Sequence, residues 1–309
     1  MTTTRLYSRE INKENNMNII SADIALAKHQ LFKRLRDSLD NQGFCEVSTP
    51  IQLASEDRNV FTLRECMELR LRSALASGLK SVYEIGQCFR GDVPDKTHLR
   101  EFHMLELFWN HDSFNDLIQL TRHLLEVAFM RPIAGFEIID LAELLPRRYP
   151  GFVYGRTYAQ LREWAKSFIQ PQQLSSFDCS YKIYNHLIDM LVDEMHPGTM
   201  ERPAMVTNYP TETICIACPQ PMRPERIQRS EFFVNGLEIG HGFVDDMNWT
   251  DVARRMEENG KDFVDVPFLE LLKSGRLPAS SGVGFGLDRI LKLLLGIDDI
   301  RQCAHELQE

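Results

Sequence analysis

Residues 82–109 read VYEIGQCFRGDVPDKTHLREFHMLELFW. The two ends of this stretch, 82–90 and 101–109, are rich in β-branched and aromatic residues, a composition typical of strands. Ten polar or turn-forming residues, 91–100, separate them. Two strands joined in this way are most simply an antiparallel hairpin with a long connection. Because long connections often carry function, residues 91–100 are the first place to expect a site.

Hydrophobic spacing predicts further elements on both sides of this hairpin. The apolar residues of 24–39 keep helical spacing, with Ser21 as a cap and Gly43 as a stop. Further helices are predicted at 65–79, 113–130, 157–168, 184–195, 250–258, 267–274 and 287–295, and further strands at 44–50, 204–208, 212–217, 232–234 and 282–286. The strands mostly follow one another without repeated helical crossovers. The predicted fold class is therefore α+β, with a mainly antiparallel sheet flanked by helices.

Composition limits the protein class. The chain has 309 residues and a formal net charge of −9, so it has no overall field that would draw it onto nucleic acid. The seven cysteines are odd in number and widely spread, as expected for reduced thiols, and Cys215 with Cys218 is more typical of structural thiols than of a metal site. With no signal peptide or spanning segment recognised, a cytoplasmic location is expected. Residues 1–20 are expected to be a polar arm and 21–309 a single unit.

Three alternating glycines mark a candidate ligand site near the C-terminus. Gly282, Gly284 and Gly286 precede Arg289 in GVGFGLDRILKLLLG, residues 282–296. Glycines on one strand let a ligand lie close to the backbone, and the guanidinium beyond could hold an anion. A bulged structural strand is the alternative reading. Neither the G-x-G-x-x-G fingerprint nor a Walker loop is present at this strand.

The hairpin carries a second group of candidate residues. Arg90 can contact a phosphate or carboxylate with two donors, and His98 can reach a terminal phosphate. The ring of Phe102 offers a face for a purine, an interaction worth about 1 to 3 kcal/mol. The alternative is a solvated loop beside an ordinary aromatic residue of the sheet.

A third group is acidic and recurs every seven residues. Glu231, Glu238 and Asp245 lie in EFFVNGLEIGHGFVDD, residues 231–246. Carboxylate oxygens suit a magnesium ion that is also held by nucleotide phosphates. Surface charge is the alternative, although three nearby glycines favour close ligand approach.

Taken in order, these groups resemble the motifs of class II aminoacyl-tRNA synthetases, particularly the lysine-type branch. GFCEVSTP, residues 43–50, is similar to the first motif, residues 89–106 to the second and residues 282–296 to the third. The similarity covers about 25–301. It implies a ligase that uses ATP and Mg²⁺ to form an aminoacyl-adenylate, and a homodimer whose interface includes Pro50.

The resemblance also assigns roles residue by residue. It implies that Arg90 and Arg289 are the catalytic cations. The implied ATP contacts are Arg90 at the α-phosphate and the amino-acid carboxylate, His98 and Arg289 at the γ-phosphate, Glu101 and Phe102 at the adenine, Asp92 in place of a usual glutamate, and Glu231 with Glu238 at the magnesium ion.

The amino-acid subsite departs most from the lysine-type pattern. Glu68 aligns with the residue that holds the substrate α-amino group. Glu106 and Asp245 match two carboxylates that meet the ε-ammonium, while Phe108 stands where a tyrosine is usual and His241 where an asparagine is usual. Two acids still favour a cationic substrate, because buried carboxylates without a partner are costly.

Layout suggests the acceptor. Only about two dozen residues precede the first motif, so an anticodon-binding domain is not expected and a tRNA acceptor is disfavoured. The layout is similar to that of the elongation factor P lysine ligases, although that family has an alanine where Gly284 stands. The expected function is therefore activation of a basic amino acid and its transfer to a protein lysine. A ligase acting on a small-molecule amine and a non-catalytic synthetase paralogue are the alternatives.

Overall fold

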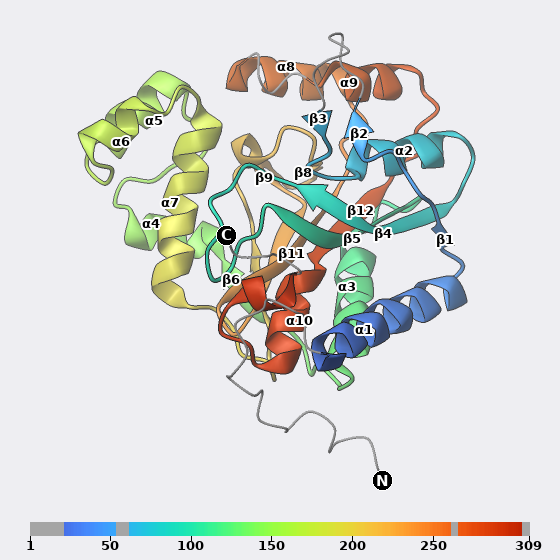
Figure 1. Cartoon of the computed structure of the whole chain (residues 1–309). Coiled ribbons are helices and arrows are strands. Elements are labelled where there is room, and N and C mark those ends of the chain that lie inside the picture. The colour runs from blue at the N-terminus through green and yellow to red at the C-terminus, as the bar shows by residue number, and fades with distance from the viewer. Residues whose placement is uncertain (1–21, 54–61, 261–264, 305–309) are drawn as a thin grey trace.

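An eight-stranded sheet forms the centre of the protein (Figure 1). The computed structural model describes residues 22–53, 62–260 and 265–304. Five of the seven pairings in the sheet are antiparallel, and the two outermost are parallel. The strand order is β1 (Cys45–Glu46), β4 (Ser81–Phe89), β5 (Glu101–Trp109), β12 (Ser281–Gly286), β11 (Leu237–Val244), β10 (Arg229–Val234), β7 (Ala204–Thr207) and β6 (Glu137–Asp140). The predicted α+β class with a mainly antiparallel sheet is confirmed.

Helices cover the sheet in three groups, each with its own apolar cluster. One face packs against α1 (Ala22–Asn41), α3 (Phe114–Phe129) and α10 (Leu287–Leu295). The β6 end of the sheet packs against α4 (Leu141–Arg148), α5 (Tyr158–Ala165), α6 (Pro171–Ser175) and α7 (Ser180–Met195). The opposite face meets α2 (Glu68–Ala76), α8 (Trp249–Asn259) and α9 (Val266–Lys273). Two small ribbons, β2 (Gln52–Leu53) with β3 (Thr62–Leu63) and β8 (Pro219–Gln220) with β9 (Arg223–Ile227), and two short 3₁₀ turns, η1 (Thr211–Thr213) and η3 (Ile300–Cys303), complete the described elements.

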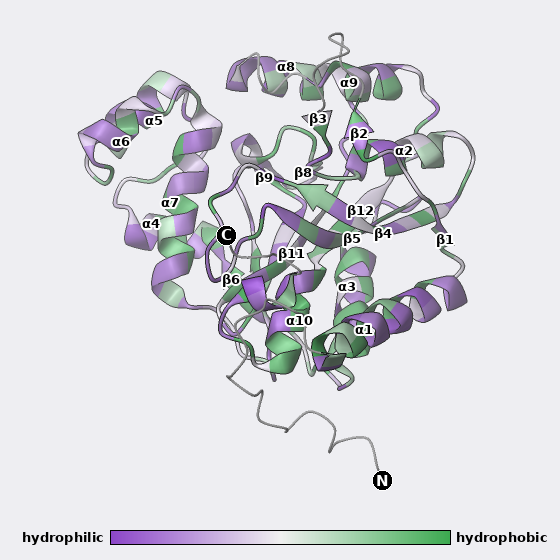
Figure 2. Ribbon diagram, viewed as in Figure 1, coloured by the Kyte–Doolittle hydropathy of each residue, from purple (hydrophilic) through white to green (hydrophobic). Residues whose placement is uncertain are grey.

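Local sequence signals account for several of these boundaries. The helix predicted at 24–39 is α1, which buries the apolar stripe from Ile24 to Leu39 and shows both hydrophobic and hydrophilic colours along its ribbon (Figure 2). Ser113 caps α3 by accepting a hydrogen bond from the backbone of Asp116. The predicted hairpin is confirmed, because β4 and β5 pair antiparallel over their whole length.

Two predicted strands are wrong in extent or type. The strand predicted at 44–50 is reduced to β1, because side chains take over the backbone groups that follow it. The Thr49 N–H donates to the Glu84 carboxylate and the Thr49 carbonyl accepts from Arg64. Instead of a strand, residues 212–217 begin in the 3₁₀ turn η1, where the Thr213 hydroxyl donates to the Pro210 carbonyl. The expected arm at 1–20 and the cap at Ser21 lie outside the described residues.

A β-bulge sets the orientation of the acidic segment. Phe232 pairs with Gly240 and Phe233 pairs with Glu238, so Ile239 is an extra residue in β11. A bulge shifts the alternation of side chains by one position. Glu238 and His241 therefore face the same side of the sheet although they are three residues apart. The sequence pattern predicts a strand in this segment only at 232–234, so β11 is not predicted.

No helix in the three described ranges is long and apolar enough to cross a membrane.

We expect the close approach of β11 and β12 to make Gly240 intolerant of a side chain. A Cβ at this position would lie 2.3 Å from the carbonyl oxygen of Gly284, which cannot move without breaking the sheet. The Gly240→Ala variant should lose about 1 to 3 kcal/mol of unfolding free energy, measured by urea denaturation. Gly91→Ala is the control, because a Cβ there has no neighbour within 4 Å. Equal stability of the two variants would contradict the argument.

Candidate active site

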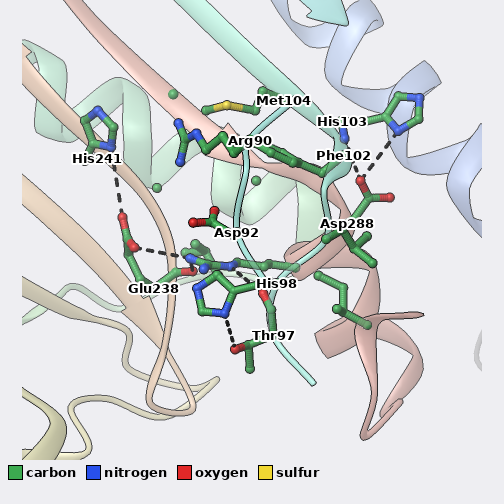
Figure 3. Close-up of a pocket in the computed structure, with 17 residues that line it drawn as sticks. Arg90, Asp92, Thr97, His98, Phe102, His103, Met104, Glu238, His241 and Asp288 are labelled. Carbon is green, nitrogen blue, oxygen red and sulfur yellow. Dashed lines mark hydrogen bonds and ion pairs between the residues drawn. The ribbon is translucent and has the colours of Figure 1, made fainter. Parts of the chain in front are cut away.

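A cavity of about 210 Å³ opens on the sheet between the β4–β5 connection, β11, β12 and the start of α10 (Figure 3). Arg90 and Arg289, which are far apart in the sequence, both line it. Nine of the residues singled out in the sequence line this cavity, namely Arg90, Asp92, His98, Phe102, Glu238, His241, Gly284, Gly286 and Arg289. The fold therefore brings the second and third motifs and the acidic segment to one place.

The β4–β5 connection is shaped by an aspartate that the sequence analysis missed. The Asp95 carboxylate accepts hydrogen bonds from the backbone N–H groups of Thr97 and His98, at 2.6 and 2.8 Å. The bond from Thr97, with further bonds from the side chains of both residues, lowers the pKa of Asp95. The same carboxylate lies 3.0 Å from Nδ1 of His98 and so orients that ring. An aspartate whose side chain accepts from the backbone two residues later is a known turn pattern, so Asp95 could have been predicted to shape this connection from the sequence.

At the cavity mouth, one arginine covers an aromatic ring. The Arg90 guanidinium lies 5.2 Å from the centre of the Phe102 ring. A planar cation beside an aromatic face can hold a phosphate while the ring stacks on a base. Glu101 does not line this cavity: its exposed side chain accepts a hydrogen bond from Gln87 at 2.6 Å and faces a neighbouring open pocket that Arg90 also lines.

Arg289 joins three parts of the cavity wall. Its Nη1 donates to the Glu238 carbonyl at 2.8 Å and lies 3.2 Å from the Glu238 carboxylate. Its Nε donates to the Thr97 carbonyl at 3.2 Å. The preceding residue, Asp288, is buried and accepts hydrogen bonds from Lys28 and from the His103 backbone, which fixes the start of α10 against β5 and α1.

The two glutamates expected to bind magnesium are both paired with arginines. Glu238 contacts Arg289, and Glu231 pairs with Arg229 and accepts a hydrogen bond from the Tyr209 hydroxyl at 2.6 Å. Within the described ranges, no three His, Cys, Asp or Glu side chains are grouped so as to hold a metal. One or two carboxylates fit a magnesium ion that is held mainly by nucleotide phosphates, and only Glu238 of this pair lines the cavity.

Behind the cavity lies a buried guanidinium that the sequence analysis did not single out. Arg72 on α2 is 1% exposed and contacts both oxygens of Asp245, with a shortest distance of 2.7 Å. It also donates to Glu68 at 3.1 Å, and its guanidinium lies 4.2 Å from the centre of the Phe108 ring. The Ser280 hydroxyl donates to the same aspartate at 2.7 Å. Asp245 is therefore fully engaged inside the protein.

Two further acids remain between the cavity and this buried pair. Glu106 is buried and accepts a hydrogen bond from the Met67 backbone at 2.8 Å. Burial and then the charge of Glu68 raise the pKa of Glu106 to about 8. Burial also opposes the ionisation of Glu68, but Arg72 and His241 outweigh it and lower the pKa of Glu68. A cation that came close to Glu106 would favour its ionised form.

His241 closes the inner end of the cavity. Its Nε2 lies 3.8 Å from Glu68 and its Nδ1 lies 4.0 Å from Glu238. Burial disfavours the charged ring, but the neighbouring Glu68 carboxylate raises the pKa of His241 overall. Gly284 lies at the boundary between the cavity and the inner region, which is the part of the site lined by Glu68, Glu106 and Phe108. A Cβ at Gly284 would lie 3.2 Å from Met104 and 3.4 Å from Glu106.

These features define a class II synthetase catalytic core. The chain belongs to the family described as tRNA synthetases class II (D, K and N), whose model matches residues 4–305. This confirms the family inferred from the three motifs.

Among its relatives are lysine–tRNA ligases from three organisms. The protein from Saccharolobus solfataricus is 26% identical over 322 residues, covering 89% of this chain and 62% of the relative. The protein from Enterococcus faecalis is 26% identical over 318 residues, covering 91% and 63%. A heat-inducible lysine–tRNA ligase of Escherichia coli is 26% identical over 318 residues, covering 89% and 61%. The chain thus spans about three fifths of the length of these relatives.

The raised pKa of Glu106 leads to a pH-dependent stability. The folded protein binds a proton at Glu106 that the unfolded chain releases near pH 4.5, so this group's contribution to stability falls as the pH rises from about 4.5 to about 8. The Glu106→Gln variant lacks this loss. Its melting temperature relative to the wild type should therefore rise between pH 5 and pH 8, as measured by calorimetry without ligand.

Glu163→Gln, an exposed glutamate on α5, is the control and should show a constant difference. A constant difference for Glu106→Gln as well would refute the pKa argument.

Proposed function

We propose that this chain uses ATP to activate a basic amino acid as its aminoacyl-adenylate and then transfers the aminoacyl group to a lysine side chain of a protein. The observation that carries this proposal is the convergence of Arg90 and Arg289 on one cavity. Two acids, Glu68 and Glu106, lie just behind that cavity with His241 between the two regions. Cations for a triphosphate and acids for an ammonium group are thus neighbours.

The first step forms the adenylate. A carboxylate oxygen of the amino acid attacks the α-phosphorus of ATP, a mixed anhydride forms, and pyrophosphate leaves. Arg90 would hold the α-phosphate and the amino-acid carboxylate together, while Arg289 and His98 would hold the γ-phosphate. Fixed cations stabilise the charge that develops on these oxygens, so no protein nucleophile is required. Phe102 would stack on the adenine, with Asp92 and Glu101 near the nucleotide.

Magnesium would enter on the nucleotide. Glu238, with Glu231 behind it, would hold the ion, which supplies charge neutralisation at the phosphates. Arg289 would then exchange the Glu238 carboxylate for a phosphate oxygen. The present contact between Arg289 and Glu238 keeps both groups in place without ATP.

The amino acid would lie with its ammonium groups toward the acids. Glu68 would meet the α-ammonium, and Glu106 would meet the side-chain ammonium. His241, Phe108 and Gly284 would border the substrate. Support comes from the raised pKa of Glu106, because a nearby cation would restore its ionised form.

In the second step an amine nitrogen attacks the carbonyl carbon of the adenylate, an amide forms and AMP leaves. The expected acceptor is a protein lysine, and the alternative is a small-molecule amine; a tRNA, which is disfavoured, would instead accept the group at a ribose hydroxyl as an ester. We also propose a homodimer through the region of Pro50, whose side chain is exposed in the single chain.

Loss of Arg90 should abolish activation. Arg90→Ala should lower the rate of ATP–pyrophosphate exchange with basic amino acids at least about 100-fold, since a cation at the reacting phosphate acts mainly in the transition state. Arg254→Ala is the control, because Arg254 is exposed on α8 and pairs only with neighbouring acids of that helix among the contacts described. Normal exchange by Arg90→Ala would remove this residue from the proposed role.

The acceptor can be identified by mass spectrometry. The protein is incubated with ATP, the activated amino acid and, separately, a candidate protein, polyamines or tRNA. A mass increase of one aminoacyl group on a protein lysine is expected. Transfer only to a polyamine or only to tRNA would refute the protein acceptor. ATP binding without exchange for any amino acid would indicate a non-catalytic paralogue instead.

A further inference from the structure

The chain supplies its own cation to one of the acids that the sequence pattern assigns to the substrate. Arg72 holds Asp245 through three contacts of 2.7 to 3.1 Å, and the aspartate side chain is 0% exposed. The Ser280 hydroxyl adds a fourth contact to the same carboxylate. A substrate ammonium could reach Asp245 only by displacing a buried guanidinium, which is costly.

Arg72 and its neighbours also fill the space. Its guanidinium is sandwiched among aromatic rings, at 4.2 Å from the centre of Phe108 and 5.1 Å from the centre of Phe268. Phe108 in turn occupies the room left by Gly282, where a Cβ would lie 2.3 Å from the ring. The pocket lined by Glu68, Glu106 and Phe108 is much narrower than the outer cavity of about 210 Å³.

The charges left over match a substrate with two ammonium groups. The inner region contains three carboxylates, Glu68, Glu106 and Asp245, and one guanidinium, Arg72. When a cation lies close enough to keep Glu106 ionised, two negative charges remain beyond the one that Arg72 neutralises. An amino acid with an uncharged side chain would neutralise one of them and leave the other buried without a partner.

We propose that Arg72 is a specificity-determining residue that shortens the amino-acid subsite, so that the site selects diamino acids with side chains shorter than that of lysine. Glu68 and Glu106 meet the two ammonium groups, and Arg72 keeps Asp245 out of reach. This inference rests on the proposed function, because it concerns the amino acid that is activated. It adds the length of the side chain, which the family resemblance does not supply.

A ladder of substrates tests the subsite length. ATP–pyrophosphate exchange is measured with 2,3-diaminopropionate, 2,4-diaminobutyrate, ornithine, lysine and alanine. At least one of the three shorter diamino acids should exceed lysine in kcat/KM by about tenfold or more, because a single methylene group is worth about 10- to 200-fold in a closed pocket. Alanine should be at least tenfold poorer than the best diamino acid.

Variants test whether Arg72 is the cause. Arg72→Ala should raise the ratio of lysine to the best short substrate about tenfold, because it frees both Asp245 and the space of the guanidinium. Arg255→Ala is a matched control, because it removes another buried arginine. Arg255 lies on α8 and pairs with Asp246 at 2.6 Å. This variant should leave the ratio unchanged. If Arg72→Ala does not fold, Arg72→Lys, which keeps the charge but loses the planar fork, should shift the ratio in the same direction.

The outcomes separate the two proposals. No exchange with any amino acid would refute the proposed function itself. Exchange that is best with lysine, or equally good with alanine, would leave activation standing and refute the short diamino substrate. A folded Arg72→Ala or Arg72→Lys variant with an unchanged ratio would refute the role of Arg72.

Discussion

The buried ion pair between Arg72 and Asp245 is the constraint around which the inner site is arranged. It links α2 to the end of β11, and the Ser280 hydroxyl extends the link to the start of β12. Such a pair adds little net stability, but removal of one partner typically costs about 3 to 5 kcal/mol because the other charge stays buried. Once this pair is present, Glu68, Phe108 and the strand facing them have little freedom to move.

Glycines make this arrangement possible. The missing side chain at Gly282 leaves room for Phe108, and the missing side chain at Gly240 lets β11 lie close to β12. The bulge at Ile239 then turns Glu238 to the same side as His241. A glutamate and a histidine that would otherwise face opposite sides of the sheet are thereby brought to one cavity wall.

Much of the outer site could be predicted from local patterns. The hairpin is encoded by two strand-like segments around a polar loop, and the meeting of Arg90 with Arg289 was implied by three motifs in order. The pair of Arg72 with Asp245 left no such signal, because its members are 173 positions apart and no periodicity connects them. The bulge was missed for a related reason, since the extra residue appears only when β11 is paired with β10.

The outer and inner arginines differ in a way that suits their different tasks. The Arg289 side chain is about one fifth exposed, and its carboxylate partner Glu238 lines the same cavity. A phosphate oxygen can therefore take the place of the Glu238 carboxylate as the partner of Arg289 without leaving a buried charge unpaired. Arg72 is almost fully buried, and all its acidic partners are fixed by α2 and the sheet. A cation that can change partners suits a nucleotide that comes and goes. Arg72 cannot change partners, so in the proposed function it forms a fixed part of the amino-acid subsite and limits which side chain fits there.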